Sequence, residues 1–114
     1  LDSDQQGKID TFLKSLADNP YSPPGELIPE PDLLNLLIGR KQAVKVSDGV
    51  VFSTKIYDIM VEKITSRIKS QEKISLAEVR DMFKTSRKYA QALLEHLDEK
   101  KITRRVGDER VLYK

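Results

Sequence analysis

The chain of 114 residues contains no cysteine and a single histidine. Without cysteine there is no disulfide bond, no thiol nucleophile and no thiolate metal site, and one imidazole does not build a zinc cluster. No apolar run approaches the roughly 20 residues that a membrane-spanning helix needs, and no signal-peptide pattern opens the sequence. These absences favour a soluble protein of a reducing, cytoplasmic compartment that binds no metal ion and no membrane.

Groups that could carry catalysis are also missing. The acidic residues are scattered over expected helix surfaces, no glycine-rich loop could cradle a phosphate, and the lone histidine is not placed for a catalytic triad. We therefore expect no catalytic residue and no cofactor in this chain. The sequence begins without an initiator methionine, and we interpret it as a fragment of a longer protein.

Two stretches of the chain, residues 33–52 and 93–112, share one pattern at a fixed spacing of 60 residues. Self-similarity of this kind is typical of one structural unit used twice. Identical residues occupy seven aligned positions: Leu33/Leu93, Leu34/Leu94, Leu37/Leu97, Lys41/Lys101, Val46/Val106, Asp48/Asp108 and Val51/Val111.

The two halves differ sharply in charge. Residues 1–53 carry 5 Lys and Arg against 8 Asp and Glu, a formal charge of −3, whereas residues 54–114 carry 15 against 10, a charge of +5. Charge asymmetry between halves suggests that the basic half meets a polyanion. The sequence therefore points to nucleic acid as the partner of the second half.

The first half is predicted to hold two helices and a hairpin. Residues 1–7 are polar and expected to be frayed, and the apolar spacing over residues 9–16 predicts a helix with one buried face. All five prolines fall within residues 20–31, where they leave room for one turn around residues 26–28. A second helix then starts at a proline, and the alternation around residues 47–49 predicts two short strands.

The second half carries the fuller pattern. Ser53 or Thr54 can cap a long helix with apolar residues on one face, and residues 75–78 open a short helix with a capping box. A tight break at residues 84–86 precedes a third helix, and a hairpin closes around Gly107-Asp108. Helix, helix, turn, helix and two-stranded hairpin form the winged-helix plan.

We therefore predict a mainly α protein with small β-hairpins (α+β), built from two tandem winged-helix domains joined by a helix. The first domain would span residues 1–53, with prolines where its second helix should be. The second domain would span residues 54–114 and hold the binding surface.

Basic residues gather where the third helix of the second half begins, at Lys84, Arg87 and Lys88. The positive end of a helix dipole disfavours cations by roughly 0.3–1 kcal/mol, so these side chains weaken the fold unless an anion binds there. Free amides at a helix start suit a phosphate group, which the nearby Ser86 could help to hold. Simple solvation of the cations is the alternative interpretation.

The closing hairpin carries Arg104, Arg105 and Arg110. If Gly107-Asp108 forms a two-residue turn, Arg105 lies opposite Arg110, and like charges so placed destabilise a sheet. An anionic partner would relieve this repulsion, although the acidic residues at the tip neutralise part of the charge. A three-residue loop would change this pairing.

The third helix also carries two side chains with rings, Tyr89 and His96. Tyr89 could stack on an unpaired base, or it could pack in the core because Leu93 and Leu97 follow it at helical spacing. His96 lies off the apolar stripe, and we expect it on the surface.

The last thirty residues also resemble a known family. The run Phe83-Lys84-Thr85-Ser86-Arg87-Lys88-Tyr89-Ala90, followed by Leu93-Leu94-Glu95, Leu97-Asp98 and the hairpin segment 103–112, resembles the C-terminal end of the bacterial selenocysteine-specific elongation factors, SelB. The resemblance is specific over residues 83–112, fades over residues 54–82, and reaches residues 1–53 only in outline.

This resemblance implies a function. SelB proteins are GTP-dependent translation factors that deliver selenocysteinyl-tRNA to ribosomes halted at UGA codons, and their last winged helix grips the selenocysteine-insertion hairpin of the mRNA. GTP and Mg²⁺ would bind in an upstream domain that this chain lacks. The mRNA hairpin would be the direct partner, and the ribosome and selenocysteinyl-tRNA would be reached through the full-length protein.

The resemblance also implies the residues that touch RNA, which are Lys84, Thr85, Ser86, Arg87, Lys88, Tyr89, Arg104, Arg105 and Arg110. We expect the tip of an RNA stem-loop to dock at these residues through its phosphates and unpaired bases, with the first unit acting as a spacer. Two other functions stay open: a DNA-binding winged-helix transcription regulator, usually a dimer, and a protein-interaction winged helix. No dimerisation helix is evident, which favours a monomer.

Overall fold

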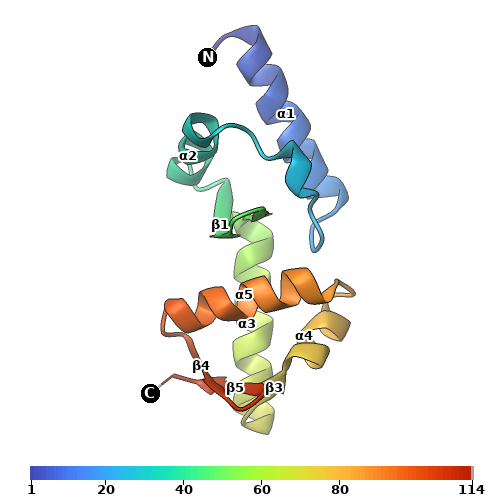
Figure 1. Ribbon diagram of the computed structural model, residues 1–114, viewed down its shortest axis with the longest axis vertical. Coiled ribbons are helices and arrows are strands. Elements are labelled where there is room, and N and C mark those ends of the chain that lie inside the picture. The colour runs from blue at the N-terminus through green and yellow to red at the C-terminus, as the bar shows by residue number, and fades with distance from the viewer. Residues whose placement is uncertain (114) are drawn as a thin grey trace. The chain divides into compact units, whose positions relative to one another are not determined.

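The computed structural model describes residues 1–113, and the chain divides into two compact units, Leu1–Tyr57 and Asp58–Lys114. In chain order the elements are α1 (Ser3–Asp18), the 3-10 turn η1 (Gly25–Leu27), α2 (Pro31–Gly39), β1 (Ala43–Ser47), β2 (Val50–Ser53), α3 (Thr54–Gln71), β3 (Ile74–Ser75), α4 (Leu76–Met82), α5 (Arg87–Glu99), β4 (Thr103–Val106) and β5 (Glu109–Leu112), as Figure 1 shows. The described residues thus form an α+β protein with five α-helices and two small antiparallel sheets.

The first helix of unit 1 starts earlier than the sequence suggested. Asp2 is its N-cap: the Asp2 carboxylate accepts from the Gln5 amide at 2.7 Å, and the Gln5 side chain accepts from the Asp2 amide at 3.1 Å. This reciprocal capping box satisfies two amides that a helix start otherwise leaves without partners. The expectation that residues 1–7 are frayed was therefore wrong, because a polar start can also be a capped one.

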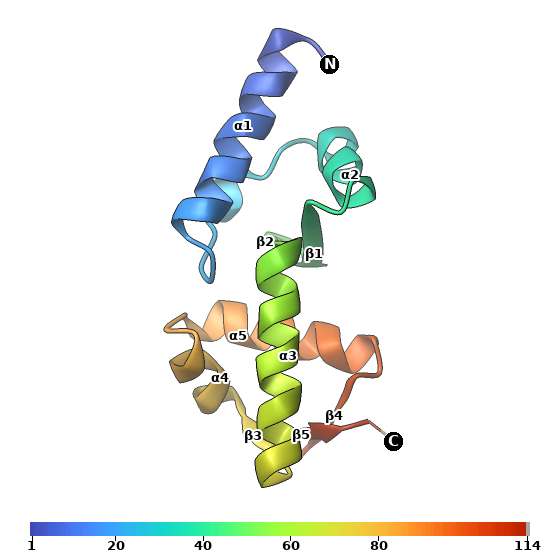
Figure 2. The same cartoon turned by 180° about the vertical axis from the view of Figure 1, so that it is seen from behind.

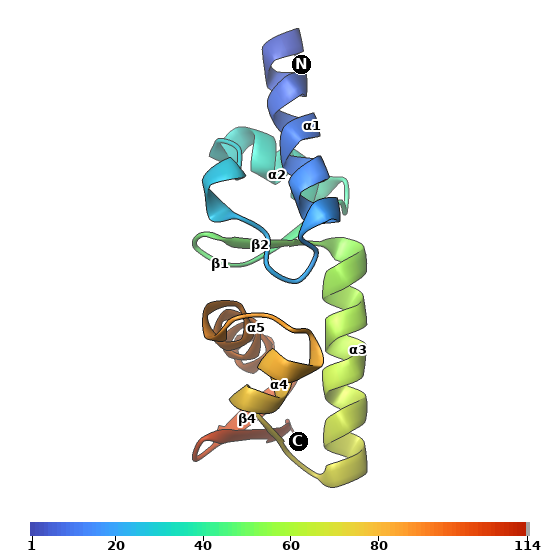
Figure 3. The same ribbon diagram turned by 90° about the vertical axis from the view of Figure 1, so that its right-hand side faces the viewer.

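The core of unit 1 forms where α1, α2 and the β1–β2 hairpin meet. Figure 3 shows both helices on the same side of the hairpin. The apolar face predicted for the first helix is buried against the leucines of α2 and two hairpin residues. The core residues are Ile9, Phe12, Leu16, Leu33, Leu34, Leu37, Ala43 and Val51.

The proline-rich segment packs against the hairpin turn. Its one regular piece is η1, as expected from the single turn predicted near residues 26–28. A Cβ atom on Gly25 would lie only 2.9 Å from the carbonyl oxygen of Gly49, which sits in the turn between β1 and β2. Glycine is therefore needed at position 25 for this close approach of the two backbones.

Residues 58–71 of α3 start unit 2. Ser53, the cap that the sequence offered, accepts a hydrogen bond from the Ile56 amide at 3.2 Å. Met60, Ile64 and Ile68 are buried along one face of the helix, as the apolar spacing predicted. Seen from behind in Figure 2, α3 runs along the unit while α5 crosses on its far side.

The sheet of unit 2 has three strands in the order β3-β5-β4. Strand β3 was missed by the sequence analysis, because two residues are too short to show alternation. It pairs Ile74 with Arg110 and Ser75 with Glu109. Strand β5 is consequently the central strand, which decides how its side chains are buried.

The short helix α4 and the long helix α5 are joined by a tight turn. The capping box predicted at residues 75–78 is present, since Ser75 and Glu78 exchange two hydrogen bonds of 3.1 Å. Lys84 adopts a left-handed backbone with φ of 49°, which is costly for a residue with a side chain. The predicted break at this point is confirmed, and α5 begins at Arg87.

The two units repeat the same connection between helix and hairpin. Lys41, after α2, and Lys101, after α5, both have φ of 60°, although neither is glycine. The surrounding backbone hydrogen bonds also match at a spacing of 60 residues: Lys41 N to Ile38 O at 3.0 Å and Lys101 N to Asp98 O at 3.1 Å, Gln42 N to Leu37 O at 2.9 Å and Ile102 N to Leu97 O at 3.0 Å.

Beyond the hairpin turn, structurally equivalent residues of the two units are no longer 60 positions apart in the sequence. Lys45 pairs with Val51 in the first hairpin, and its counterpart Arg105 pairs with Arg110 in the second. The register of the first hairpin shifts between Lys45 and Ser47, where an extra residue forms a bulge. The structural counterpart of Arg110 is therefore Val51, whereas the gapless sequence alignment paired Val51 with Val111.

His96 is buried, with 7% of its surface exposed. The expectation of a surface position was wrong. The buried face of α5 is wider than the single stripe of leucines that predicted its orientation, and it comprises Ala90, Leu93, Leu94, His96 and Leu97. Burial keeps the pKa of the His96 imidazole below its ordinary value of 6.5, and the nearby Lys100 charge lowers this pKa further.

Candidate functional site

The start of α5 lacks a side-chain cap. Ser86 is its N-cap, with extended backbone angles, but the Ser86 side chain forms no capping hydrogen bond with the helix. The first turn of α5 contains no acidic residue. Among the described residues, neither a Ser86 cap nor an acidic side chain of the first turn offsets the positive end of this helix, which therefore favours an anion.

Cations surround this helix start. Lys84, Arg87 and Lys88 are all exposed, as is Ser86. The left-handed turn at Lys84 is held by two backbone bonds, from Lys84 N to Asp81 O at 3.4 Å and from Thr85 N to Arg80 O at 3.0 Å. The turn sets where the exposed cations lie relative to the first turn of α5.

Thr85 and Tyr89 are less available than their neighbours, because both are half-buried. The ammonium group of Lys88 lies 5.4 Å from the centroid of the Tyr89 ring, a distance typical of a cation–π contact. The ring of Tyr89 is thus partly covered from within the protein.

The β4–β5 hairpin forms the wing. The Arg105 guanidinium donates from Nε to the Gly107 carbonyl at 2.8 Å, and its Nη2 lies 3.9 Å from the Asp108 carboxylate. Arg104 is also exposed, and because neighbouring residues of a strand point to opposite faces, it lies on the face away from Arg105. The wing therefore carries one exposed arginine on each face.

Arg110 is not the exposed wing cation that the sequence suggested. It does pair with Arg105 across the ladder, as the two-residue turn predicted. However, only 6% of its side chain is exposed, and both Nε and Nη2 bind the Asp98 carboxylate, at 3.2 and 3.1 Å. The predicted repulsion was wrong, because β5 is the central strand and Asp98 of α5 neutralises the buried guanidinium.

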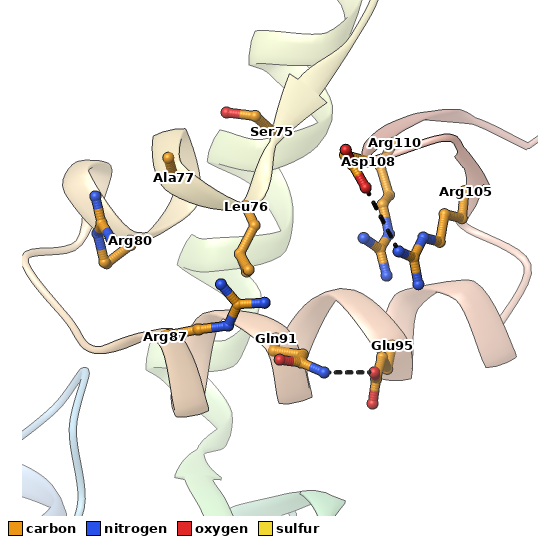
Figure 4. Close-up of a pocket in the computed structure, with 10 residues that line it drawn as sticks. All are labelled: Ser75, Leu76, Ala77, Arg80, Arg87, Gln91, Glu95, Arg105, Asp108 and Arg110. Carbon is orange, nitrogen blue, oxygen red and sulfur yellow. Dashed lines mark hydrogen bonds and ion pairs between the residues drawn. The ribbon is translucent and has the colours of Figure 1, made fainter.

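A cleft of about 450 Å³ opens between the start of α4, one face of α5 and the wing. Figure 4 shows its side chains: Arg87 of α5 and Arg105 and Arg110 of the wing are directed toward the same space, whereas Arg80 of α4 lies at the margin of the cleft. The lining residues are Ser75, Leu76, Ala77, Arg80, Arg87, Gln91, Glu95, Arg105, Asp108 and Arg110. Four of them are arginines and two are acidic, so the cleft favours an anionic or hydrogen-bond-accepting ligand.

The cleft brings together only part of the site that the sequence predicted. Arg87, Arg105 and Arg110 line it. The remaining predicted residues lie around the helix start or on the other side of the wing: Lys84, Thr85, Ser86, Lys88, Tyr89 and Arg104.

Sequence reasoning missed Arg80, Gln91 and Glu95, although one signal was available. Gln91 and Glu95 follow Arg87 at helical spacing of four and eight residues, so they form a polar stripe along α5. Gln91 donates to Glu95 at 3.1 Å, and Arg80 is near its neighbour Asp81 at 3.4 Å. Arg80 could only be found once the position of α4 was known.

The capping box of α4 borders the cleft. The Glu78 carboxylate accepts from the Gln71 side chain at 2.6 Å and from the Ser75 amide at 3.1 Å, and Arg67 lies 3.4 Å away. The hydrogen bond from Gln71, followed by those within the capping box, holds the pKa of Glu78 below its ordinary value of 4.5. Glu78 is thus a charged structural group that fixes the start of α4.

No group of three or more His, Cys, Asp or Glu residues could hold a metal ion within residues 1–113. In the same part of the chain, no helix combines the length and the apolar character that crossing a bilayer requires.

The fold and the cleft define unit 2 as a winged-helix domain with a basic face at the start of its third helix and along its wing. Residues 66–112 match the family model described as "Elongation factor SelB, winged helix". This C-terminal part of the chain is therefore similar to the SelB winged helix.

A curated relative supports the same family. The selenocysteine-specific elongation factor of Desulfomicrobium baculatum is 30% identical over 82 residues, which cover 72% of this chain. The chain spans only 13% of the length of that relative.

Two solved structures share the fold over the whole chain. The mRNA-binding domain of elongation factor SelB from E. coli, solved in complex with SECIS RNA, gives a TM-score of 0.68 at 16% identity, with 100% of both chains covered. The bacterial selenocysteine-specific elongation factor EF-Sec gives a TM-score of 0.70 at 21% identity, with 100% of this chain and 20% of that chain covered.

Proposed function

We propose that unit 2 binds the SECIS hairpin of mRNA through the start of α5, the wing and the cleft between them. The observation that carries this proposal is a cleft lined by four arginines, of which Arg87 and Arg105 are exposed cations, beside a helix start without a side-chain cap. This surface lies within the part of the chain that matches the SelB winged helix. The E. coli SelB domain with the same fold was solved in complex with SECIS RNA.

The proposed contacts divide by chemistry. The exposed cations Lys84, Arg87, Lys88, Arg104 and Arg105 would neutralise backbone phosphates, while the first amides of α5 and Ser86 hold one phosphate directly. The cleft would receive unpaired bases of the loop, because the deep major groove of A-form RNA excludes a helix. An isolated RNA duplex should therefore bind poorly.

The proposal extends to the whole chain as two tandem winged-helix domains joined by a helix. The matching geometry at Lys41 and Lys101 supports a shared plan for the two units. Unit 1 has η1 where unit 2 has α4, and its proline-rich segment lies against its own wing turn at Gly49. Unit 1 would thus act as a spacer and not as a second RNA-binding surface.

The role in translation belongs to a longer protein. The curated relative is a selenocysteine-specific elongation factor of which this chain spans 13%. In our proposal this chain is its monomeric, non-catalytic RNA-binding module, and GTP, Mg²⁺, selenocysteinyl-tRNA and the ribosome are bound elsewhere in the full-length factor. The module would recruit selenocysteinyl-tRNA to UGA codons that a SECIS hairpin accompanies.

Competition binding tests this function. A labelled SECIS hairpin is bound to the chain and displaced with the unlabelled hairpin, with its stem as a loop-free duplex, and with duplex DNA of the same sequence. We expect the hairpin alone to compete well, with four to five phosphate contacts giving a log–log salt slope of roughly −3 to −4. Amide NMR signals of residues 84–90 and 103–111 should shift during the titration.

The other outcomes separate the alternative functions. Preferred binding of duplex DNA would instead support a transcription regulator. A slope near zero, with no shift in either segment, would leave the basic surface without a role in nucleic-acid binding and would overturn the proposal.

A further inference from the structure

A buried polar network lies beneath the cleft of unit 2. Asp98 of α5 accepts from Thr103 at the start of β4, over 2.6 Å, and from Arg110 in the central strand, over 3.1 and 3.2 Å. Thr103 is 1% exposed and Arg110 is 5% exposed. The three side chains tie α5 to two strands of the wing.

Unit 1 shows what the fold itself requires at these positions. The helix, first-strand and second-strand counterparts of the network are Ile38, Ala43 and Val51, as the shared hydrogen bonds and the shifted strand register establish. Ala43 and Val51 belong to the core of unit 1, and Ile38 packs against it. The same junction is therefore apolar in unit 1 and polar in unit 2.

A buried ion pair is a costly way to fill such a junction. The Arg110 side chain is 6% exposed and the Asp98 side chain 25%, so both charged groups lose most of their water. Replacing a buried pair with well-packed apolar side chains of similar volume is often neutral or stabilising. Unit 1 demonstrates that an apolar trio fits this junction. Stability thus does not account for the network in unit 2.

The geometry of Arg110 indicates what the network provides. Its Nε and Nη2 are occupied by Asp98, and Nη1 has no hydrogen-bond partner among the described residues, while the side chain lines the cleft. Because Asp98 cancels its charge, the pair attracts phosphate weakly. What remains is a rigid N–H donor that faces the cleft, suited to a neutral acceptor such as a base carbonyl or ring nitrogen.

We propose that Asp98 and Thr103 are positioning residues that hold Arg110 as a specificity-determining donor for an unpaired base of the bound RNA, separate from the exposed cations that contact phosphate. This inference rests on the proposed RNA-binding function. It assigns Arg110 to base recognition, whereas the sequence placed it among the phosphate-neutralising cations of the wing.

Transplanting the unit 1 trio into unit 2 tests the inference. The variant Asp98→Ile, Thr103→Ala, Arg110→Val removes one negative and one positive charge, so its net charge is unchanged. Its binding is compared with that of the unsubstituted chain on two RNAs, a SECIS hairpin and the same hairpin with a scrambled loop. Circular dichroism and thermal unfolding check that the variant keeps its fold.

We expect the variant to lose about 10-fold or more in affinity for the SECIS hairpin, the size of one lost arginine–base contact. Affinity for the scrambled loop and the salt slope should not change. Unchanged SECIS affinity would overturn the inference, and so would an equal loss on both RNAs with a slope reduced by about 0.7, which marks a phosphate contact. Failure of the unsubstituted chain to bind either RNA would instead overturn the proposed function.

The single variant Asp98→Asn gives a second test that does not depend on the transplant folding. It removes a negative charge beside the cleft, so an account based on charge alone expects tighter RNA binding. The positioning account expects weaker binding of the SECIS hairpin, because an amide holds the guanidinium less firmly than a carboxylate does. Tighter binding of the SECIS hairpin by Asp98→Asn would overturn the inference.

Discussion

Arg105 and Arg110 are direct partners across the β4–β5 ladder, yet their charges are compensated in different ways. The Arg110 side chain is 6% exposed and bound to Asp98, whereas the Arg105 side chain is 58% exposed and lies near the wing tip. The difference in exposure follows from the strand order, because β5 is the central strand and β4 is an edge strand. The pair that looked repulsive in the sequence is therefore a buried cation held by Asp98 beside a solvent-facing one.

The first prediction concerns this buried pair. Changing Asp98 to Ala leaves the Arg110 guanidinium buried without a counter-charge, and we expect the free energy of unfolding to fall by about 3–5 kcal/mol. Urea denaturation followed by circular dichroism measures the change. The matched control is Asp48→Ala, which removes the exposed partner of Lys45 in the first hairpin and should have no measurable effect. Equal effects of the two substitutions would contradict the assignment.

The second prediction concerns Gly25. A Cβ atom there would lie 2.9 Å from the backbone oxygen of Gly49, so Gly25→Ala must push η1 and the first hairpin apart. We expect a loss of about 1–3 kcal/mol in stability, as for other overpacked sites.

Gly7→Ala is the matched control for this substitution. Gly7 lies inside α1 with nothing within 4 Å of an added Cβ, so alanine should stabilise the helix by about 0.5–1 kcal/mol. Thermal unfolding of the two variants should therefore show melting temperatures shifted in opposite directions. A neutral Gly25→Ala would show that the proline-rich segment is not packed as described.

The elements of the fold followed from local sequence signals. Capping residues, helical apolar spacing and paired turn residues predicted the five α-helices and both hairpins, because each signal acts within a few neighbouring residues. The signals failed where a longer-range partner decided the outcome. Strand β3 is two residues long and exists because β5 offers an edge to Ile74 and Ser75.

The site was predicted less completely for the same reason. The basic helix start at Arg87 and the exposed wing cation Arg105 could be seen in the sequence. The burial of Arg110 required its pairing with Asp98, twelve residues earlier in the chain, and the contribution of Arg80 required the position of α4. The charged residues of a sequence predict whether a surface is basic or acidic, but only the packed structure shows which of these side chains are exposed on it.

The third prediction concerns the dependence of stability on pH. Burial first, and the Lys100 charge second, hold the pKa of His96 below 6.5. Between the two pKa values, His96 is therefore protonated in the unfolded chain but not in the folded protein. The full contribution to stability is present above pH 6.5 and is lost as the pH falls through the interval between the two pKa values.

His96→Leu should remove this dependence. His96 is the one histidine of the chain, and no other side-chain type ordinarily titrates between about pH 7.5 and 5.5. We expect the free energy of unfolding of the unsubstituted chain to decrease over that range and that of His96→Leu to stay nearly level, as measured by urea denaturation at constant ionic strength. Parallel pH profiles would show that His96 is not buried in its neutral form.

The fourth prediction is that one substitution at Ser86 changes stability and RNA affinity in opposite directions. This residue is the N-cap of α5, its side chain makes no capping bond, and no acidic residue follows in the first turn. Ser86→Asp should therefore stabilise the fold, by about 0.3–1 kcal/mol, because a carboxylate interacts favourably with the positive end of the helix. The same carboxylate would occupy the amides proposed to hold a phosphate and would repel it, so affinity for the SECIS hairpin should fall.

Opposite signs in the two measurements are the decisive result. Ser86→Ala serves as the control, because it adds no charge and removes a side chain that forms no capping bond, so its effect on stability should be small. Thermal unfolding and RNA titration are carried out on both variants at the same salt concentration. If Ser86→Asp raised stability and left RNA affinity unchanged, the start of α5 would not contact phosphate, and the interface would have to lie on the wing and the cleft alone.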